Sequence, residues 1–274
     1  MAIGIMKEGF IKRFFKDKKR VKALIWIVVF SPLLLIFLCL LLVGIFADIP
    51  SFEELEDPKS PLATQIISQE GEVLSTFHIE NRAYVTFDEL SQGLKDAIVA
   101  TEDVRFYEHS GIDARSLARV FVKSFLMGNR SSGGGGSTLS QQLAKSLFPR
   151  DTVKSKFPGA KYFVLGANKF KEWITAVKLE RNYTKQEILS MYMNTVFFGS
   201  NAYGIKAAAG TFFGKLPKDL NIEESALLVG MVNMPTRYNP VRNPEKSLVR
   251  RNHVIGQMYK YGYITKQERD SIRE

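Results

Sequence analysis

Apolar residues recur at helical spacing along most of the chain, and this pattern predicts a mainly α-helical protein. The first such stripe consists of Leu90, Leu94, Ala97 and Ile98. Residues 63–77 do not follow this helical spacing. Residues 63–67 and 72–77 are short runs on either side of Gln69-Glu70-Gly71, which predicts a small β-hairpin. No strand signal of comparable strength follows, so the expected class is mainly α with one β-hairpin element.

Helix N-termini are marked by capping boxes, in which a small polar residue is followed three positions later by Glu. The four pairs are Thr86/Glu89, Thr184/Glu187, Asn221/Glu224 and Thr265/Glu268. Asp113 is expected to cap a further helix, and two more helices are predicted over residues 137–147 and 168–182. The helix that follows Thr86 is expected to end at Glu102 and Asp103.

An uncharged run from Ala23 to Ala47 predicts a transmembrane helix, because about 25 residues rising roughly 1.5 Å each can span a bilayer. The run is too long for the apolar core of a cleavable signal peptide. Eight basic and two acidic residues precede it and supply +6 of the net charge of +10. Nucleic-acid binding is an alternative for this basic tail, but beside a membrane segment the positive-inside rule accounts for it better.

The predicted organisation is therefore a basic cytoplasmic tail (1–22), a transmembrane helix (23–47), a proline-containing stalk (48–61) and one folded domain (62–274) on the outer side of the membrane. The single cysteine, Cys39, lies in the membrane segment, which excludes an intrachain disulfide. The three histidines are too dispersed along the sequence to indicate a metal cluster.

Two segments carry candidate chemistry. Glu102 and Asp103 stand at a predicted helix C-terminus, where unpaired carbonyls carry partial negative charge, and such a carboxylate suits a general base. On residue type alone, solvated acids in a turn are the more common interpretation of such a pair. The glycine run that ends at Gly136 leads into a helix, as in loops that bind phosphate with backbone N–H groups. A flexible linker is the alternative, and the Gly-Lys-Ser/Thr ending of a nucleotide-binding loop is absent.

Residues 100–111 and 136–142 together resemble the first two motifs of the family 51 peptidoglycan glycosyltransferases, membrane-anchored enzymes that polymerise lipid II. Lys169-Phe170-Lys171-Glu172 resembles the third motif, residues 207–215 the fourth, and residues 235–252 the fifth. The resemblance covers about residues 48–270 and implies a lysozyme-like glycosyltransferase fold. The Ser-x-x-Lys and Lys-Ser/Thr-Gly signatures of a penicillin-binding transpeptidase are absent from this sequence.

The resemblance implies two catalytic carboxylates: Glu102 as the base, and Glu172 at the pyrophosphate leaving group. It implies substrate contacts for Asp103, Arg119, Ser137, Thr138, Gln141, Gln142, Lys145 and Lys169. Without the resemblance, Glu172 could equally be an intrahelical partner of Lys169. The sequence departs from the family where Asn168 replaces a usual Arg and where residues 155–167 resemble an insertion. A donor-side cation is then expected from Lys171, Lys161 or Arg150.

The expected reaction is inverting transfer that joins lipid II units into β-1,4-linked glycan strands and releases undecaprenyl pyrophosphate. The expected partners are lipid II, the growing lipid-linked chain, the membrane and other cell-wall synthesis proteins, with no nucleic acid. No cofactor is required, although two carboxylates and serine hydroxyls are compatible with Mg²⁺. The alternatives are a membrane-anchored enzyme that cleaves glycan strands and an inactive cell-wall scaffold.

Overall fold

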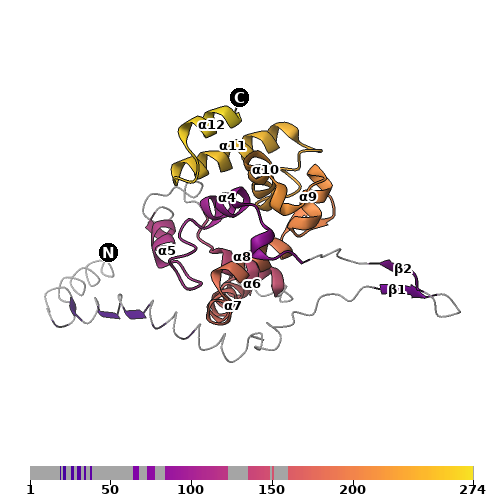
Figure 1. The fold of residues 1–274 in the computed structure, drawn as a ribbon. Coiled ribbons are helices and arrows are strands. Elements are labelled where there is room, and N and C mark those ends of the chain that lie inside the picture. Colours follow the sequence, from indigo (N-terminus) through magenta and orange to yellow (C-terminus); the bar gives the residue numbers. More distant parts are fainter. Residues whose placement is uncertain are drawn as a thin grey trace, which may run out of the picture. The chain divides into compact units, whose positions relative to one another are not determined.

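The computed structural model describes residues 84–122, 135–148, 150 and 160–273, the strand residues 64–67 and 73–77, and isolated positions between 19 and 38 (Figure 1). The chain divides into two compact units. One comprises Met1–Ile49 with Val153–Lys171, and the other comprises Pro50–Thr152 with Glu172–Glu274. The helical core and the cavity described below belong to the second unit.

Helices dominate the described residues, as the apolar spacing predicts. The α-helices are α4 (Gln92–Glu102), α5 (Ala114–Phe121), α6 (Leu139–Leu147), α7 (Ala160–Asn182), α8 (Lys185–Thr195), α9 (Ile205–Phe213), α10 (Ile222–Val232), α11 (Pro244–Lys260) and α12 (Lys266–Arg273). Two short 3-10 helices are η1 (Phe87–Glu89) and η3 (Pro217–Asp219). The mainly α class is confirmed and fits a lysozyme-like domain.

The predicted β-hairpin is confirmed. Strands β1 (Thr64–Ile67) and β2 (Val73–Phe77) pair antiparallel, with Thr64 opposite Phe77. A second, smaller antiparallel pair was not expected from the sequence. It joins β3 (Phe197–Gly199) to β4 (Ala202–Tyr203) through a tight turn in which Ser200 and Asn201 adopt positive φ angles. These strands are too short to carry an alternating pattern, and for that reason the sequence did not predict them.

The capping predictions are confirmed at four helix starts and corrected at a fifth. At α12, the Thr265 N–H donates to the Glu268 carboxylate over 2.7 Å and the Glu268 N–H donates to the Thr265 hydroxyl over 3.2 Å, which forms the predicted box. Thr184 and Asn221 form complete capping boxes at α8 and α10, and Asp113 caps α5 through a hydrogen bond from the Ser116 N–H. The Thr86 box is also formed, but it opens the 3-10 turn η1. The helix that was expected to follow it directly, α4, starts later, with Ser91 as its own N-cap. The prediction merged two elements because their apolar residues share one periodicity.

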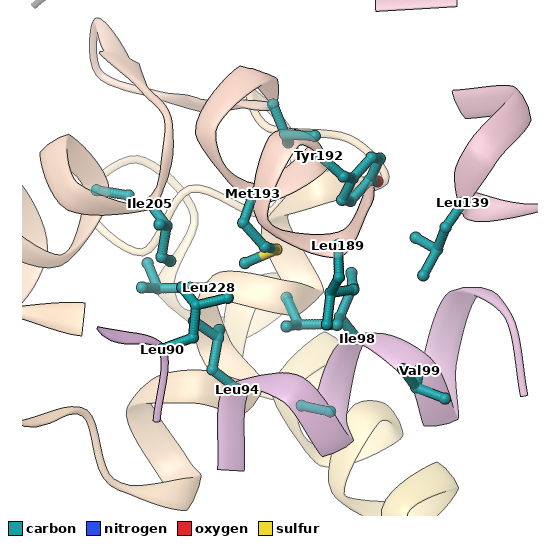
Figure 2. Close-up of a cluster of buried hydrophobic side chains, with 14 of the residues drawn as sticks. Leu90, Leu94, Ile98, Val99, Leu139, Leu189, Tyr192, Met193, Ile205 and Leu228 are labelled. Atoms are coloured by element: carbon teal, nitrogen blue, oxygen red, sulfur yellow. The ribbon is translucent and has the colours of Figure 1, made fainter. Parts of the chain in front are cut away.

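The buried core of the second unit forms where α4, α8, α10 and α11 pack together, with α6 against α8. Figure 2 shows Leu94 and Ile98 of α4 pointing toward Leu189 and Met193 of α8, with Leu228 of α10 beside them. All five side chains are fully buried. This packing holds the C-terminal end of α4, and with it Glu102, in a fixed position.

The predicted transmembrane helix (23–47) lies almost wholly outside the described residues. Among the residues that are described, no helix combines the length and the apolar character that crossing a bilayer requires.

The N-terminal boundary of α7 differs from the prediction. This helix was predicted from residue 168, but it begins at Ala160, so the segment resembling an insertion contributes to the helix.

Candidate active site

A cavity of about 520 Å³ opens beside the C-terminal end of α4. Three parts of the second unit form its walls: the end of α4 and the following loop, α5 with the residues before α6, and one face of α11. The residues that line it include Glu102, Asp103, Asp113, Ser116, Arg119, Gly135, Gly136, Ser137, Thr138, Arg250, His253, Gln257, Lys260 and Tyr261. The first two sequence motifs therefore meet at one cavity.

Glu102 is the last residue of α4, as predicted, and its side chain is 13% exposed. One carboxylate oxygen, Oε2, accepts a hydrogen bond of 3.1 Å from Nε2 of Gln142 on α6. The other oxygen, Oε1, lies 3.7 Å from a guanidinium nitrogen of Arg250 on α11. The carboxylate is thus held from two sides while it still faces the cavity.

Gln142 is itself oriented by Tyr192 on α8, whose hydroxyl donates to Gln142 Oε1 over 2.9 Å. Burial first, and the nearby charge of Glu102 second, raise the pKa of Tyr192 well above 10, so this hydroxyl remains a donor. Because Oε1 accepts from Tyr192, the amide nitrogen of Gln142 must face Glu102. Tyr192 was not among the predicted site residues, because nothing in its sequence neighbourhood marks it.

Asp103, the next residue, fixes the loop that follows α4. Its Oδ2 accepts hydrogen bonds from Nε2 of His109 and from the backbone N–H of Leu139, each over 2.9 Å. The second bond places a buried carboxylate at the positive end of α6, which is favourable. His109 Nδ1 accepts from the Gly111 N–H, so its proton resides on Nε2, where it is donated to Asp103.

Gly111 joins the two motifs. Its carbonyl accepts hydrogen bonds from the Thr138 hydroxyl (2.7 Å) and from the Gln141 amide (3.1 Å). Its φ angle is +91°, and a Cβ at this position would lie 2.9 Å from the backbone of Ala176. Only glycine meets both demands. Thr138 and Gln141 are buried, and Gln141 directs its amide into the protein interior.

A partly buried ion pair supports the same loop from α8. Lys185 donates to the His109 carbonyl over 2.6 Å and to Glu180 over 2.8 Å, and its ammonium lies 4.5 Å from the centre of the Phe106 ring. Glu180 also accepts a hydrogen bond from Ser140 at the start of α6. One lysine therefore ties the loop to α7, α8 and, through Glu180, to α6.

The α5 wall carries a second charged group. Asp113 accepts a hydrogen bond of 2.6 Å from Arg105, and the Ser116 hydroxyl accepts from both Arg105 and Arg119. Burial alone would raise the pKa of Asp113, but hydrogen bonds from Ser116 and then the Arg105 guanidinium lower it to about 2. In the described part of the chain, Nε of Arg105 and of Arg119 are buried without a hydrogen-bond acceptor. Arg119 lines the cavity, and of its guanidinium nitrogens one donates to Ser116 while Nε is buried.

The comparisons with known proteins agree with this arrangement. A family model described as Transglycosylase matches residues 70–259. Penicillin-binding protein 1A of Aquifex aeolicus is 36% identical over 236 residues, and Penicillin-binding protein 1F of Bacillus subtilis is 38% identical over 206 residues. These alignments cover 86% and 75% of this chain, but only 31% and 27% of the relatives.

The chain belongs to the transglycosylase family. The predicted recognition of a family 51 peptidoglycan glycosyltransferase domain is confirmed. The chain spans less than a third of the length of the two relatives named above. A solved structure of Penicillin-Binding Protein 1A from Haemophilus influenzae is also similar, with a TM-score of 0.42 and 23% identity over 78% of this chain and 20% of that one.

Within this transglycosylase domain, the third-motif carboxylate lies on α7. Glu172 is buried and shares a helix face with Ala176 and Leu179, as predicted. Its Oε1 accepts a hydrogen bond of 2.7 Å from Nε of Arg150. Arg150 is one of the three residues that the sequence nominated as a replacement cation. The catalytic role of Glu172 stays a prediction.

The remaining predicted substrate contacts divide by location. Arg119, Ser137 and Thr138 line the cavity with Glu102 and Asp103. Gln141 and Gln142 are engaged with Gly111 and Glu102, so we assign them positioning roles, and their direct contact with substrate stays a prediction. Lys145 is exposed on the last turn of α6, and Lys169 lies on α7 in the other unit. Their contacts with substrate also stay predictions.

Arg250, like Tyr192, is a site residue that the sequence did not predict. The fifth motif was expected to close the core, yet its arginine reaches the cavity and the Glu102 carboxylate. Glu102 is 148 residues away in sequence, so no local pattern indicates that the two residues meet.

No group of three His, Cys, Asp or Glu side chains able to hold a metal ion occurs among the described residues.

Proposed function

We propose that this chain polymerises lipid II into β-1,4-linked glycan strands and releases undecaprenyl pyrophosphate. The observation that supports this most is the pairing, in one cavity, of a carboxylate fixed by Gln142 and Arg250 with a basic wall that holds Arg119. A base and an anion-binding wall are the two parts that glycosyl transfer from a pyrophosphate donor requires.

In the proposed reaction, Glu102 accepts the proton of the acceptor's 4-hydroxyl as that oxygen attacks the anomeric carbon of the donor. The new bond joins the acceptor oxygen to the anomeric carbon, and the bond from that carbon to the pyrophosphate oxygen breaks. A single displacement inverts the anomeric configuration, so no covalent enzyme intermediate forms.

The leaving pyrophosphate gains negative charge as the bond breaks. The positive charge of Arg119 and the backbone around Gly136 to Thr138, which line the cavity, are suited to stabilise this charge. Glu172 and Arg150 form a hydrogen-bonded ion pair that we assign to the donor side, where Lys145 and Lys169 would add positive charge. If Mg²⁺ binds the pyrophosphate, it would supply further charge there, although the described residues contain no group of three His, Cys, Asp or Glu side chains able to hold it.

The lipid substrate stays in the bilayer, so the site must act at a membrane surface. We propose that the apolar segment 23–47 anchors the chain in the bacterial cytoplasmic membrane, with the basic tail on the cytoplasmic side and the catalytic domain outside. Other cell-wall synthesis proteins are proposed partners at the same location.

The proposal is tested by incubating the purified full chain in detergent with labelled lipid II and separating the products by size. Glycan strands together with released undecaprenyl pyrophosphate are the expected result. Shortening of preformed strands with no growth would favour a cleaving enzyme. Binding of lipid II without any product would favour a scaffold.

A further inference from the structure

The wall of the cavity that α11 provides has no assigned role in the reaction above, apart from Arg250. Arg250, His253, Gln257 and Lys260 follow one another at intervals of three, four and three residues, which places them on one face of the helix. All four line the cavity, and Tyr261 continues the wall at the helix end. The buried face of the same helix holds Val254, Ile255 and Met258 in the core.

The carboxylates that line the cavity contact other groups and do not pair with Lys260 of this wall. Asp103 is engaged by His109 and the Leu139 N–H, and Asp113 is engaged by Arg105 and Ser116. Glu102 lies near Arg250. Among the described residues, no carboxylate lies within ion-pair distance of Lys260, whose ammonium is 5.0 Å from the centre of the Tyr261 ring.

The other members of the wall are polar and uncharged at neutral pH. Partial burial, and secondarily the charge of Arg250, lower the pKa of His253, so its imidazole is neutral. Gln257 offers both an amide donor and an acceptor, and Tyr261 offers an exposed aromatic ring. The ammonium of Lys260 can pair with a carboxylate, the amide of Gln257 can hydrogen-bond a peptide group, and the ring of Tyr261 can pack against a peptide. Together these groups suit a peptide that carries a free carboxylate.

We propose that the Gln257–Lys260–Tyr261 wall binds the peptide substituent of the sugar substrate through a carboxylate of that peptide. This inference rests on the proposed function, since it assigns the wall to the same substrate. Lys260 pairs with the carboxylate, Gln257 hydrogen-bonds a peptide amide, and Tyr261 packs against the peptide. This contact uses the α11 wall of the cavity, whereas the pyrophosphate is assigned to Arg119 and the residues before α6.

The test compares two lipid II substrates. In one, the carboxylates of the peptide substituent are free, and in the other they are amidated. Both keep the pyrophosphate, so an effect on the phosphates changes both equally. Initial rates of polymerisation are measured for the full chain in detergent and for the Lys260→Ala, Lys260→Glu and Gln257→Ala variants. Lys266→Ala is the matched control, because Lys266 is exposed on α12 and lies outside the cavity lining.

The wild-type chain is expected to favour the free carboxylate roughly fivefold in kcat/KM, as one partly exposed ion pair allows. Lys260→Ala should remove that preference, Lys260→Glu should reverse it, and Lys266→Ala should keep it. Gln257→Ala should raise the KM for both substrates.

Two results would overturn the inference. The wild type could polymerise both substrates equally well, or Lys260→Ala could slow both by the same factor, which would assign the lysine to the pyrophosphate. Absence of polymer from either substrate would instead contradict the proposed function, and the inference would fall with it.

Discussion

The side-chain amide of Gln142 donates a 3.1 Å hydrogen bond to the Glu102 carboxylate, and Tyr192 fixes the direction of that amide from the other side. The three residues come from α6, α4 and α8, whose packing sets their spacing. The base of the proposed reaction is therefore positioned through a buried tyrosine that is not itself part of the cavity lining.

Replacing Tyr192 with Phe tests this arrangement. The change removes the hydroxyl that orients Gln142, so the amide can rotate and present its oxygen to Glu102, which is repulsive. We expect kcat to fall about tenfold, corresponding to about 1.4 kcal/mol, with little change in KM. Tyr203→Phe, on β4, is the control for loss of a tyrosine hydroxyl elsewhere. An equal decrease in both variants would refute the positioning role.

The conformation of Gly111 gives a stability prediction. Gly111→Ala adds a Cβ that meets the Ala176 backbone at 2.9 Å and also strains a φ angle of +91°. The free energy of unfolding should drop by more than about 2 kcal/mol, measured by denaturant titration. Gly214→Ala separates the two causes, because Gly214 has a φ of +64° but no atom within 4 Å of the added Cβ. It should cost about 1 kcal/mol. Equal losses would mean that the contact with Ala176 contributes nothing.

Asp113 gives a pH prediction. Its folded pKa of about 2 is below the usual 3.8, so its ionised form stabilises the fold above about pH 4, and this contribution disappears as the pH falls toward 2. Allowing for solvent screening of the partly exposed Arg105, the contribution is about 1 to 2 kcal/mol.

The corresponding experiment measures the free energy of unfolding at pH 7 and pH 3. Asp113→Asn keeps the cap geometry but loses the charge, so it should destabilise the chain more at pH 7 than at pH 3. Asp219→Asn, at an exposed position in η3, serves as the control. If both variants changed stability by the same amount at the two pH values, the assigned role of the Asp113 charge would be wrong.

The sequence predicted those features that depend on neighbouring residues. The capping boxes at Thr184 and Asn221, the cap at Asp113 and the end of α4 at Glu102 all follow from contacts within four positions. It also placed the first two motifs at a common site, although only through a family resemblance. The separate cap at Ser91 was missed because Thr86, five residues earlier, offers the stronger local pattern.

The features that the sequence did not predict are contacts between distant segments. Arg250 of α11 meets Glu102 of α4, and Tyr192 of α8 meets Gln142 of α6, only through the packing of helices that are distant in sequence. The sequence spacing places Arg250, His253, Gln257 and Lys260 on one face of α11, but it does not show that this face lines a cavity. Similarly, the burial of Gln141 depends on the Gly111 carbonyl, which a loop brings to it from thirty residues away.

The central claim is that Glu102 is the base. Its most direct test is the rate of lipid II polymerisation by Glu102→Gln beside the wild type, with lipid II binding measured on the same samples. The substitution keeps the size of the side chain and an oxygen that can accept the bond from Gln142, so the fold and binding should be retained. We expect the polymerisation rate to fall by at least a hundredfold with binding unchanged. Polymerisation within a few-fold of wild type would contradict the assignment of Glu102.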